Sequence, residues 1–215
     1  MIQSKMILVA LLAIWLAGCQ KSSSPYNDVF THSSKYVKKS SDGSFVPSER
    51  RNSSGGKDYF LEFRARNAYS YGHASVVLGT LNEKGQVPVD SKGVLVKGRT
   101  EVAGLHPRTR SIVPFSVGHV LPVLAETGWS DGDSEDEYVT ARYTLKLTER
   151  QFKRVAAQVR KRKENSPVWH AVAASCVTFI RGVAYDIGLR TPKRPHLPTG
   201  FVSSIKVLNG QNPKI

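Results

Sequence analysis

The residue in this chain best suited to covalent chemistry is Cys176. A helix is expected to begin at Ser175 or Cys176, because Ser175 can cap it and Cys176, Ile180, Val183 and Ile187 repeat at helical spacing. Unpaired backbone N–H groups at a helix start favour a thiolate and can donate to an oxyanion. The spacing therefore predicts a nucleophilic sulfur beside its own oxyanion hole.

A cysteine nucleophile needs a base, and His73 is the best candidate. It lies in the β-rich segment 71–81, in which small neighbouring residues leave room for a close approach. Both residues also have a purely structural alternative. His73 could be a strand histidine whose hydrogen bonds are satisfied within the fold, and Cys176 a small residue buried on the apolar face of the helix.

The sequences around these two residues resemble a known superfamily. Gly72-His73-Ala74 opens a strand, and Ser175-Cys176-Val177-Thr178-Phe179 opens a helix that leads to Gly188-Leu189 and Thr191-Pro192. This order resembles the circularly permuted papain-like proteins, a group similar to NlpC-type cell-wall peptidases and lecithin retinol acyltransferase relatives. Ser175 stands where relatives often have asparagine.

The resemblance implies a division of roles in which Cys176 is the nucleophile and His73 its base. A third polar residue on the next strand would orient the imidazole. Glu101 is the first choice for this residue and His119 the second.

Two competing motifs lie in one acidic segment. Gly128-Trp129-Ser130-Asp131-Gly132 fits the Gly-x-Ser-x-Gly string of serine hydrolases, but an acidic loop and not a helix follows it. The acids could bind calcium, yet the sixth loop position lacks the required glycine, which favours a solvated hairpin loop. These acids are Asp131, Asp133, Glu135, Asp136 and Glu137. No zinc spacing, phosphate loop or dinucleotide fingerprint is present, so no metal or cofactor is implied.

The elements that must position the site are predicted from periodicity and turn residues. Thr148 and Gln151 form a capping box for a helix to about Lys163, and the second helix ends at Gly188. Strands are expected over 59–66, 71–81, 93–102, 111–117 and 137–147, with a turn at Asn67 and Ala68. The predicted fold class is α+β, an antiparallel sheet packed on two helices, and the resemblance implies a permuted papain-like, NlpC-like architecture.

The first residues predict export. Lys5 precedes an apolar run over 6–17 that is too short to span a bilayer, and the run closes on Leu16-Ala17-Gly18-Cys19. This closing segment resembles a lipobox, which implies lipid on Cys19 and, with Gln20 next, an outer-membrane location facing the periplasm. We therefore expect a signal peptide over 1–18, a flexible tether over 19–57 and one domain over 58–215.

The net charge of +14 favours polyanionic partners. Outside the cytoplasm these are peptidoglycan or anionic lipid headgroups and not nucleic acid, although a basic surface also serves solubility alone. The predicted first helix concentrates cations: Arg150, Lys153, Arg154, Arg160, Lys161, Arg162 and Lys163. Two hypotheses follow. One is a Cys-His thiol hydrolase or acyltransferase acting on cell-wall peptide amides or on a lipid ester, and the other is a non-catalytic lipoprotein that binds envelope polyanions or a partner protein.

Overall fold

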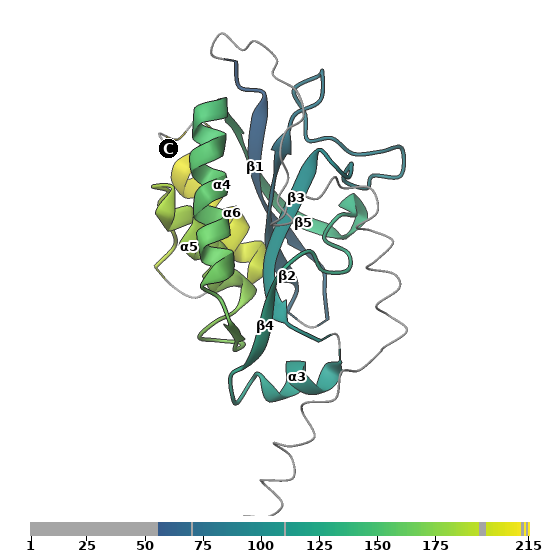
Figure 1. The fold of residues 1–215 in the computed structure, drawn as a ribbon, viewed down its shortest axis with the longest axis vertical. Coiled ribbons are helices and arrows are strands. Elements are labelled where there is room, and N and C mark those ends of the chain that lie inside the picture. The colour runs from purple at the N-terminus through teal and green to yellow at the C-terminus, as the bar shows by residue number, and fades with distance from the viewer. Residues whose placement is uncertain (1–55, 70, 110, 194–196, 212, 214) are drawn as a thin grey trace, which may run out of the picture. The chain divides into compact units, whose positions relative to one another are not determined.

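A computed structural model describes residues 56–69, 71–109, 111–193, 197–211, 213 and 215. The predicted signal peptide, the lipidation site Cys19 and most of the predicted tether lie outside the described residues. Within the described part, the fold is mixed α+β, with a six-stranded antiparallel sheet and four α-helices (Figure 1).

The sheet has the order β5-β1-β2-β3-β4-β6. Its strands are β1 (Tyr59–Arg66), β2 (His73–Thr80), β3 (Thr100–Pro107), β4 (Val123–Gly128), β5 (Val139–Leu147) and β6 (Val168–Trp169). The predictions for 59–66, 71–81 and 137–147 are confirmed within two residues. The turn after β1 is longer than Asn67 and Ala68, because Gly72 N–H bonds back to Ala68 O.

Alternation along β1 and β2 separates the two faces of the sheet. Leu61, Phe63 and Ala65 of β1 join Ala74, Val76 and Leu78 of β2 in the large apolar core. Three helices cover this face: α4 (Glu149–Glu164), α5 (Cys176–Asp186) and α6 (Pro198–Asn209). A smaller cluster of Phe60, Val77, Leu81 and Leu95 lies on the other face.

The cap of α4 is the one predicted from sequence. The Thr148 hydroxyl accepts from Gln151 N–H, and the Gln151 side chain accepts from Thr148 N–H, so two orphan donors are satisfied. Phe152, Val155, Ala156 and Val159 form its buried stripe. The second predicted helix is α5, and Gly188 follows it with a φ of 84°, which favours glycine.

Three expectations were wrong. Segment 93–102 is mostly turns and isolated bridges, and the strand begins only at Thr100. Segment 111–117 contains the short helix α3 (Ile112–Val117), because the Ser111 hydroxyl accepts from Val113 N–H and caps a helical turn despite the β-branched run. The helical layer has a third member, α6, which packs on β5 and β1.

Candidate active site

His73 occupies the first position of β2, opposite Arg66 of β1 in the antiparallel register. Because Ala74 points into the helix-covered core, the His73 side chain lies on the other face of the sheet. The residue is buried, with 9% of its surface exposed. The predicted base is therefore fixed by a rigid strand and not by a loop.

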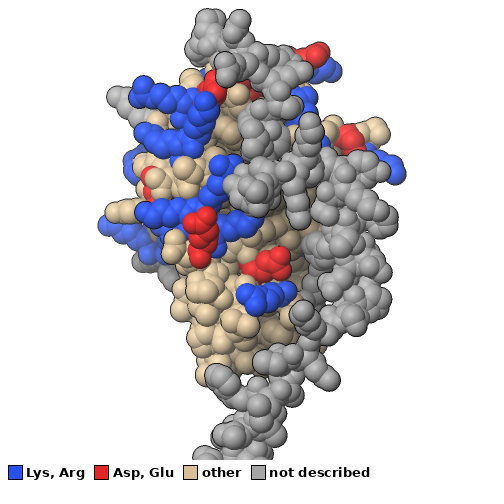
Figure 2. All heavy atoms as spheres, in the orientation of Figure 1, with Lys and Arg blue, Asp and Glu red and all other residues tan. Residues whose placement is uncertain are grey.

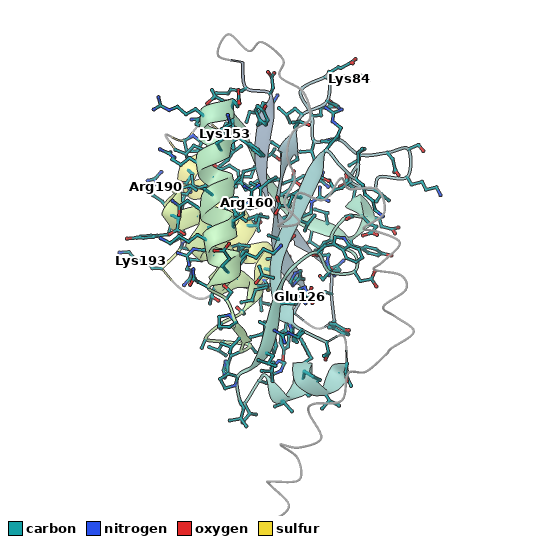
Figure 3. All side chains as sticks on the ribbon, in the orientation of Figure 1. Lys84, Glu126, Lys153, Arg160, Arg190 and Lys193 are labelled. Atoms are coloured by element: carbon teal, nitrogen blue, oxygen red, sulfur yellow. The ribbon has the colours of Figure 1, made fainter. Side chains whose placement is uncertain are left out.

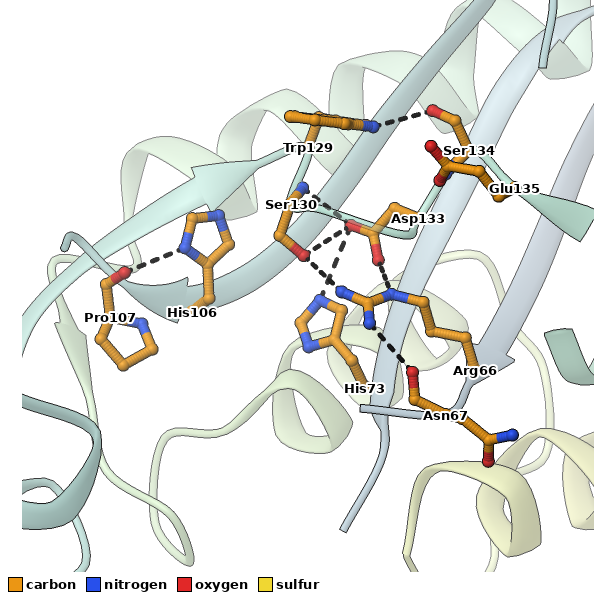
Figure 4. Close-up of polar contacts among 10 residues, drawn as sticks. All are labelled: Arg66, Asn67, His73, His106, Pro107, Trp129, Ser130, Asp133, Ser134 and Glu135. Carbon is orange, nitrogen blue, oxygen red and sulfur yellow. Dashed lines mark hydrogen bonds and ion pairs between the residues drawn. The ribbon is translucent and has the colours of Figure 1, made fainter. Parts of the chain in front are cut away.

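Asp133 lies beside the His73 ring (Figure 4). Its Oδ2 is 3.8 Å from His73 Nε2, and its Oδ1 is 2.6 Å from Arg66 Nε. Ser130 donates to Oδ2 from both its backbone N–H, at 2.9 Å, and its hydroxyl, at 3.0 Å. A fully buried carboxylate is thus held by a guanidinium and a tight turn while it faces the imidazole.

The loop that delivers Asp133 explains the glycine-serine motif. Gly132 has a φ of 82°, and the Ser130 side chain also accepts from Arg66 Nη2 at 2.9 Å. Ser130 therefore has a structural role here, and no helix follows it, as the sequence indicated. The prediction of a solvated acidic loop was wrong for Asp133, whose ion pair with Arg66 draws it into the interior.

The pKa of His73 is lowered to about 4. Burial is the largest cause, the Arg66 and His106 charges lower it further, and the Asp133 carboxylate opposes these effects. The imidazole is consequently neutral at pH 7.

Cys176 is the first residue of α5, as predicted. Ser175 is the cap residue, and its N–H donates to Thr178 Oγ1 at 2.8 Å, which fixes the entry of the chain into the helix. The cysteine has intermediate exposure and packs against the large core. The helix start thus holds the sulfur next to the sheet.

The backbone N–H groups of Ala74 and Val177 lie near enough to the Cys176 sulfur to favour its thiolate form. Ala74 directly follows His73, and the ladder between β2 and β3 begins only at Val76 and Ala103, so this part of β2 is not paired with β3. The structure therefore brings the sulfur to the backbone of the residue that follows the candidate base, and not to the imidazole, which lies on the other face of the sheet.

The predicted lowering of the cysteine pKa was wrong. Burial raises the pKa of Cys176 to about 11, the Asp133 charge adds to the rise, and the hydrogen bonds from Ala74 and Val177 only partly offset it. At neutral pH the resting pair is a thiol and a neutral imidazole.

The strands β2 and β3 enclose the His73 ring. A Cβ on Gly104 would lie 2.6 Å from His73 Nε2, so only glycine leaves room for the ring there. Farther along β3, His106 lies with its ring centroid 6.4 Å from that of His73, and its Nδ1 contacts Pro107 O at 3.0 Å. Among the described residues, Nε2 of either histidine has no hydrogen-bond partner.

The residues predicted to orient His73 are not the ones the structure brings there. Glu101 pairs with Leu78, toward the opposite end of β2, because β3 starts seven residues later than predicted and runs antiparallel. His119 Nδ1 bonds to Phe115 O at 2.8 Å, and its ring packs on Tyr71, Phe115 and Trp169. Sequence reasoning missed Asp133 and His106, and the only signal for Asp133 was the Ser-Asp-Gly turn beside it.

Within the part of the chain that the structure describes, no helix has the length and hydropathy to cross a bilayer. The same residues contain no group of three His, Cys, Asp or Glu side chains arranged to hold a metal ion. Comparison of the chain with protein-family models, with curated proteins and with solved structures gives no match.

Proposed function

We propose that this chain is an exported lipoprotein whose domain is a thiol-dependent acyl hydrolase or acyltransferase of permuted papain-like architecture. Cys176 is the nucleophile, His73 its base, and Asp133 the residue that positions the imidazole. One observation carries the proposal: the backbone of the residue after His73 lies beside the Cys176 sulfur, while His73 Nε2 faces a buried carboxylate.

The two ring nitrogens of His73 have different surroundings. Nε2 is directed at Asp133. Because the His73 ring and the Cys176 sulfur lie on opposite faces of the sheet in this structure, the proposal requires Nδ1 to approach the sulfur past the part of β2 that is not paired with β3. A carboxylate beside the ring favours the imidazolium that forms when the sulfur loses its proton. The order of a histidine strand, further strands and then a cysteine helix agrees with the permuted arrangement.

The reaction starts from a neutral pair, since burial lowers the pKa of His73 and raises that of Cys176. Proton transfer from sulfur to His73 accompanies formation of the S–C bond, and the carbonyl electron pair moves to oxygen. N–H groups at the start of α5 donate to this oxyanion. His73 then protonates the leaving nitrogen or oxygen, and water or another acceptor attacks the thioester and releases the sulfur.

Cell-wall peptide amides are the proposed substrate class. The support is the predicted export of the chain, the excess of Lys and Arg over Asp and Glu, and the resemblance of the two motifs to NlpC-type peptidases. A basic protein is attracted to anionic polymers of the envelope.

A trapping experiment tests the chemistry. The full chain is incubated with p-nitrophenyl acetate, and acetyl groups are located by peptide mass spectrometry. We expect acetylation of Cys176, its loss in Cys176→Ala, and acetylation about 100-fold slower in His73→Gln, because base catalysis contributes factors of that size. His119→Gln is the matched control and should acetylate at the wild-type rate. Acetylation that is equally fast in His73→Gln would refute the assignment of the base.

A second experiment tests the substrate class. Purified cell wall is digested with the wild-type chain and with Cys176→Ala, and the released fragments are identified by mass spectrometry. New peptide amide cleavage in the wild-type sample alone supports the proposal. Acetylated Cys176 without any cleavage would retain the chemistry and reject cell-wall peptide.

The alternative function is a non-catalytic binding module. The resting neutral pair, with its sulfur against the core, favours this alternative. Iodoacetamide distinguishes the two functions: a thiol that reacts at pH 7 only after the protein unfolds indicates the module, whereas labelling of the folded chain that slows in His73→Gln indicates the enzyme.

A further inference from the structure

One end of the sheet exposes an unusual amount of apolar surface. The helix α3 has no buried residue, although its sequence is Ile-Val-Pro-Phe-Ser-Val. The exposed aliphatic residues at this end, called the apolar end below, are Ile112, Val113, Val117, Val120, Leu121, Leu124, Val168 and Val172. Val120 and Val172 keep 78% and 79% of their surfaces exposed, so neither contributes to the core, and together with their neighbours they form an apolar patch on the surface.

Two segments of the chain build the apolar end, and they are joined by backbone hydrogen bonds. Val123 and Leu124 of β4 pair with Trp169 and Val168 of β6, and Ala171 N–H donates to Gly118 O at 3.0 Å. Neither segment, 112–125 or 166–180, contains an Asp, Glu, Lys or Arg. The apolar end is thus one continuous uncharged surface, visible as the tan region beside α3 in Figure 2.

Aromatic rings border this surface. Phe115 stacks on Trp169 with centroids 5.5 Å apart, His119 lies 4.9 Å from Phe115, and exposed Tyr69 and Tyr71 contact the same rings. Rings with an apolar body and a polar edge are favoured where hydrocarbon meets water. The border therefore has the composition of an interfacial belt.

Charged residues of both signs adjoin this surface, on β4 and at the end of α4. Arg108 is exposed, and its N–H bonds to Leu124 O. Lys161 and Lys163 are exposed at the end of α4, where Ser166 bonds back to Arg162 O and Pro167 O accepts from Ala125 N–H. Two acids adjoin the surface as well: Glu126, labelled in Figure 3, lies in β4, and the exposed Glu164 ends α4.

We infer that the apolar end inserts into the headgroup region of a bilayer that contains anionic phospholipid. Aliphatic side chains would enter the acyl boundary, the rings would lie at headgroup level, and Arg108, Lys161 and Lys163 would face lipid phosphates. Arg108, Lys161 and Lys163 suit an anionic lipid surface, whereas the uncharged interior of the patch has no charges that could select a particular protein partner. This inference goes beyond the proposed function and does not depend on it.

Insertion would give Cys176 a defined location. Val172 of the apolar end precedes it by four residues, and the bond from Ala171 N–H to Gly118 O ties this segment to the loop after α3. The sulfur would lie close to the membrane surface whatever the substrate.

A local fluorescence measurement tests the inference. The full chain with Cys19→Ser and Cys176→Ser receives one new cysteine, Leu121→Cys, which is labelled with nitrobenzoxadiazole and mixed with phosphatidylglycerol/phosphatidylethanolamine vesicles. We expect a blue shift and quenching by lipids brominated on their acyl chains. The matched control carries Lys84→Cys, which Figure 3 places at the end of the sheet away from α3, and this label should show neither effect. Because both proteins lack Cys176, the result is independent of catalysis.

A second substitution checks which residues drive insertion. Leu124→Glu in the Leu121→Cys protein should weaken vesicle partition at least about tenfold. This factor corresponds to the free energy gained when one leucine side chain is withdrawn from water. Its unfolding transition should match that of the parent, since Leu124 is exposed. Absence of the blue shift, or equal quenching at the Leu121 and Lys84 labels, would overturn the inference. So would sedimentation as a dimer without lipid that Leu124→Glu dissociates, because a second copy would then cover the surface.

Discussion

The two faces of the sheet near His73 are stabilised by different interactions. On the helix-covered face, Leu61, Val76, Ile180 and Ile205 pack without polar side chains among them, and burial of apolar area accounts for their contribution. On the other face, Arg66, Ser130 and Asp133 surround the imidazole with ion pairs and hydrogen bonds. The first arrangement is insensitive to protonation, whereas the second depends on it.

The largest expected effect comes from removing the carboxylate. Asp133→Ala leaves Arg66 without its buried partner, which costs about 3–5 kcal/mol of unfolding free energy. Urea unfolding followed by circular dichroism measures this loss. The control is Asp131→Ala, an exposed acid in the same loop, which should change stability by about 0.5 kcal/mol at most. Similar small effects for both would refute the role given to the polar face.

Acid should destabilise the protein through His73. The folded pKa, about 4, lies below the unfolded value of 6.5, so the unfolded chain binds more protons between these values. Stability is therefore complete above pH 6.5 and falls toward pH 4, with a maximum loss of about 3 kcal/mol. Urea unfolding at several pH values measures it, and His73→Gln should flatten the profile. A profile with the same slope in His73→Gln would contradict the assignment.

Alkali should act through Cys176 in the opposite direction. The folded pKa is raised to about 11 from 9, so the unfolded chain loses its proton first, and stability falls as the pH rises above 9. The difference in unfolding free energy between the wild-type chain and Cys176→Ser, measured from pH 8 to 10.5, isolates this term. A difference that is constant with pH would mean that the thiol is not desolvated.

Truncation of the helix-covered core should give a smaller loss that is independent of pH. Ile180→Val removes one methylene from a fully buried position and should cost about 1 kcal/mol at both pH 5 and pH 8. The measurement is urea unfolding at the two pH values. A pH-dependent cost would mean that the two faces are not energetically distinct.

The smallest effect is expected at the surface of α4. Lys153 Nζ lies 2.6 Å from Glu149 Oε1, four residues earlier, and the lysine is largely exposed. Lys153→Ala should therefore change stability by a few tenths of a kcal/mol. Thermal unfolding at low and high salt measures the difference, and a loss above about 1 kcal/mol would show that surface pairs contribute more than this geometry allows.

Elements whose signals are local could be predicted from the sequence. The alternating pattern of β1 gave its bounds, and Thr148 with Gln151 gave the start of α4. Ser111–Val117 was assigned to a strand because β-branched residues dominate it, whereas a serine cap and solvent exposure allow a helix. The helix α6 was not predicted, although Pro198 at its start and Gly210 at its end frame an apolar stripe of Phe201, Val202 and Ile205.

The site was only partly predictable for the same reason. Cys176 and His73 open their own elements, so a capping residue and a strand pattern were enough to select them. The position of Asp133 depends on an ion pair to Arg66, 67 residues away in sequence, which no local pattern reveals. Glu101 was chosen because it was placed near the end of a strand over 93–102, whereas it is the second residue of β3 and pairs with Leu78, five residues from His73.

The absence of a side chain at Gly104 links two positions of the chain. The space that a Cβ would occupy there is already taken by His73 Nε2, with Ala74 O and Ser75 Cβ each 3.2 Å away. Alanine at position 104 would displace the ring, but a chain with a small residue at position 73 would relieve the closest of these contacts. Related chains that retain the histidine should therefore keep glycine opposite it, and those that lose the histidine should be released from this restriction.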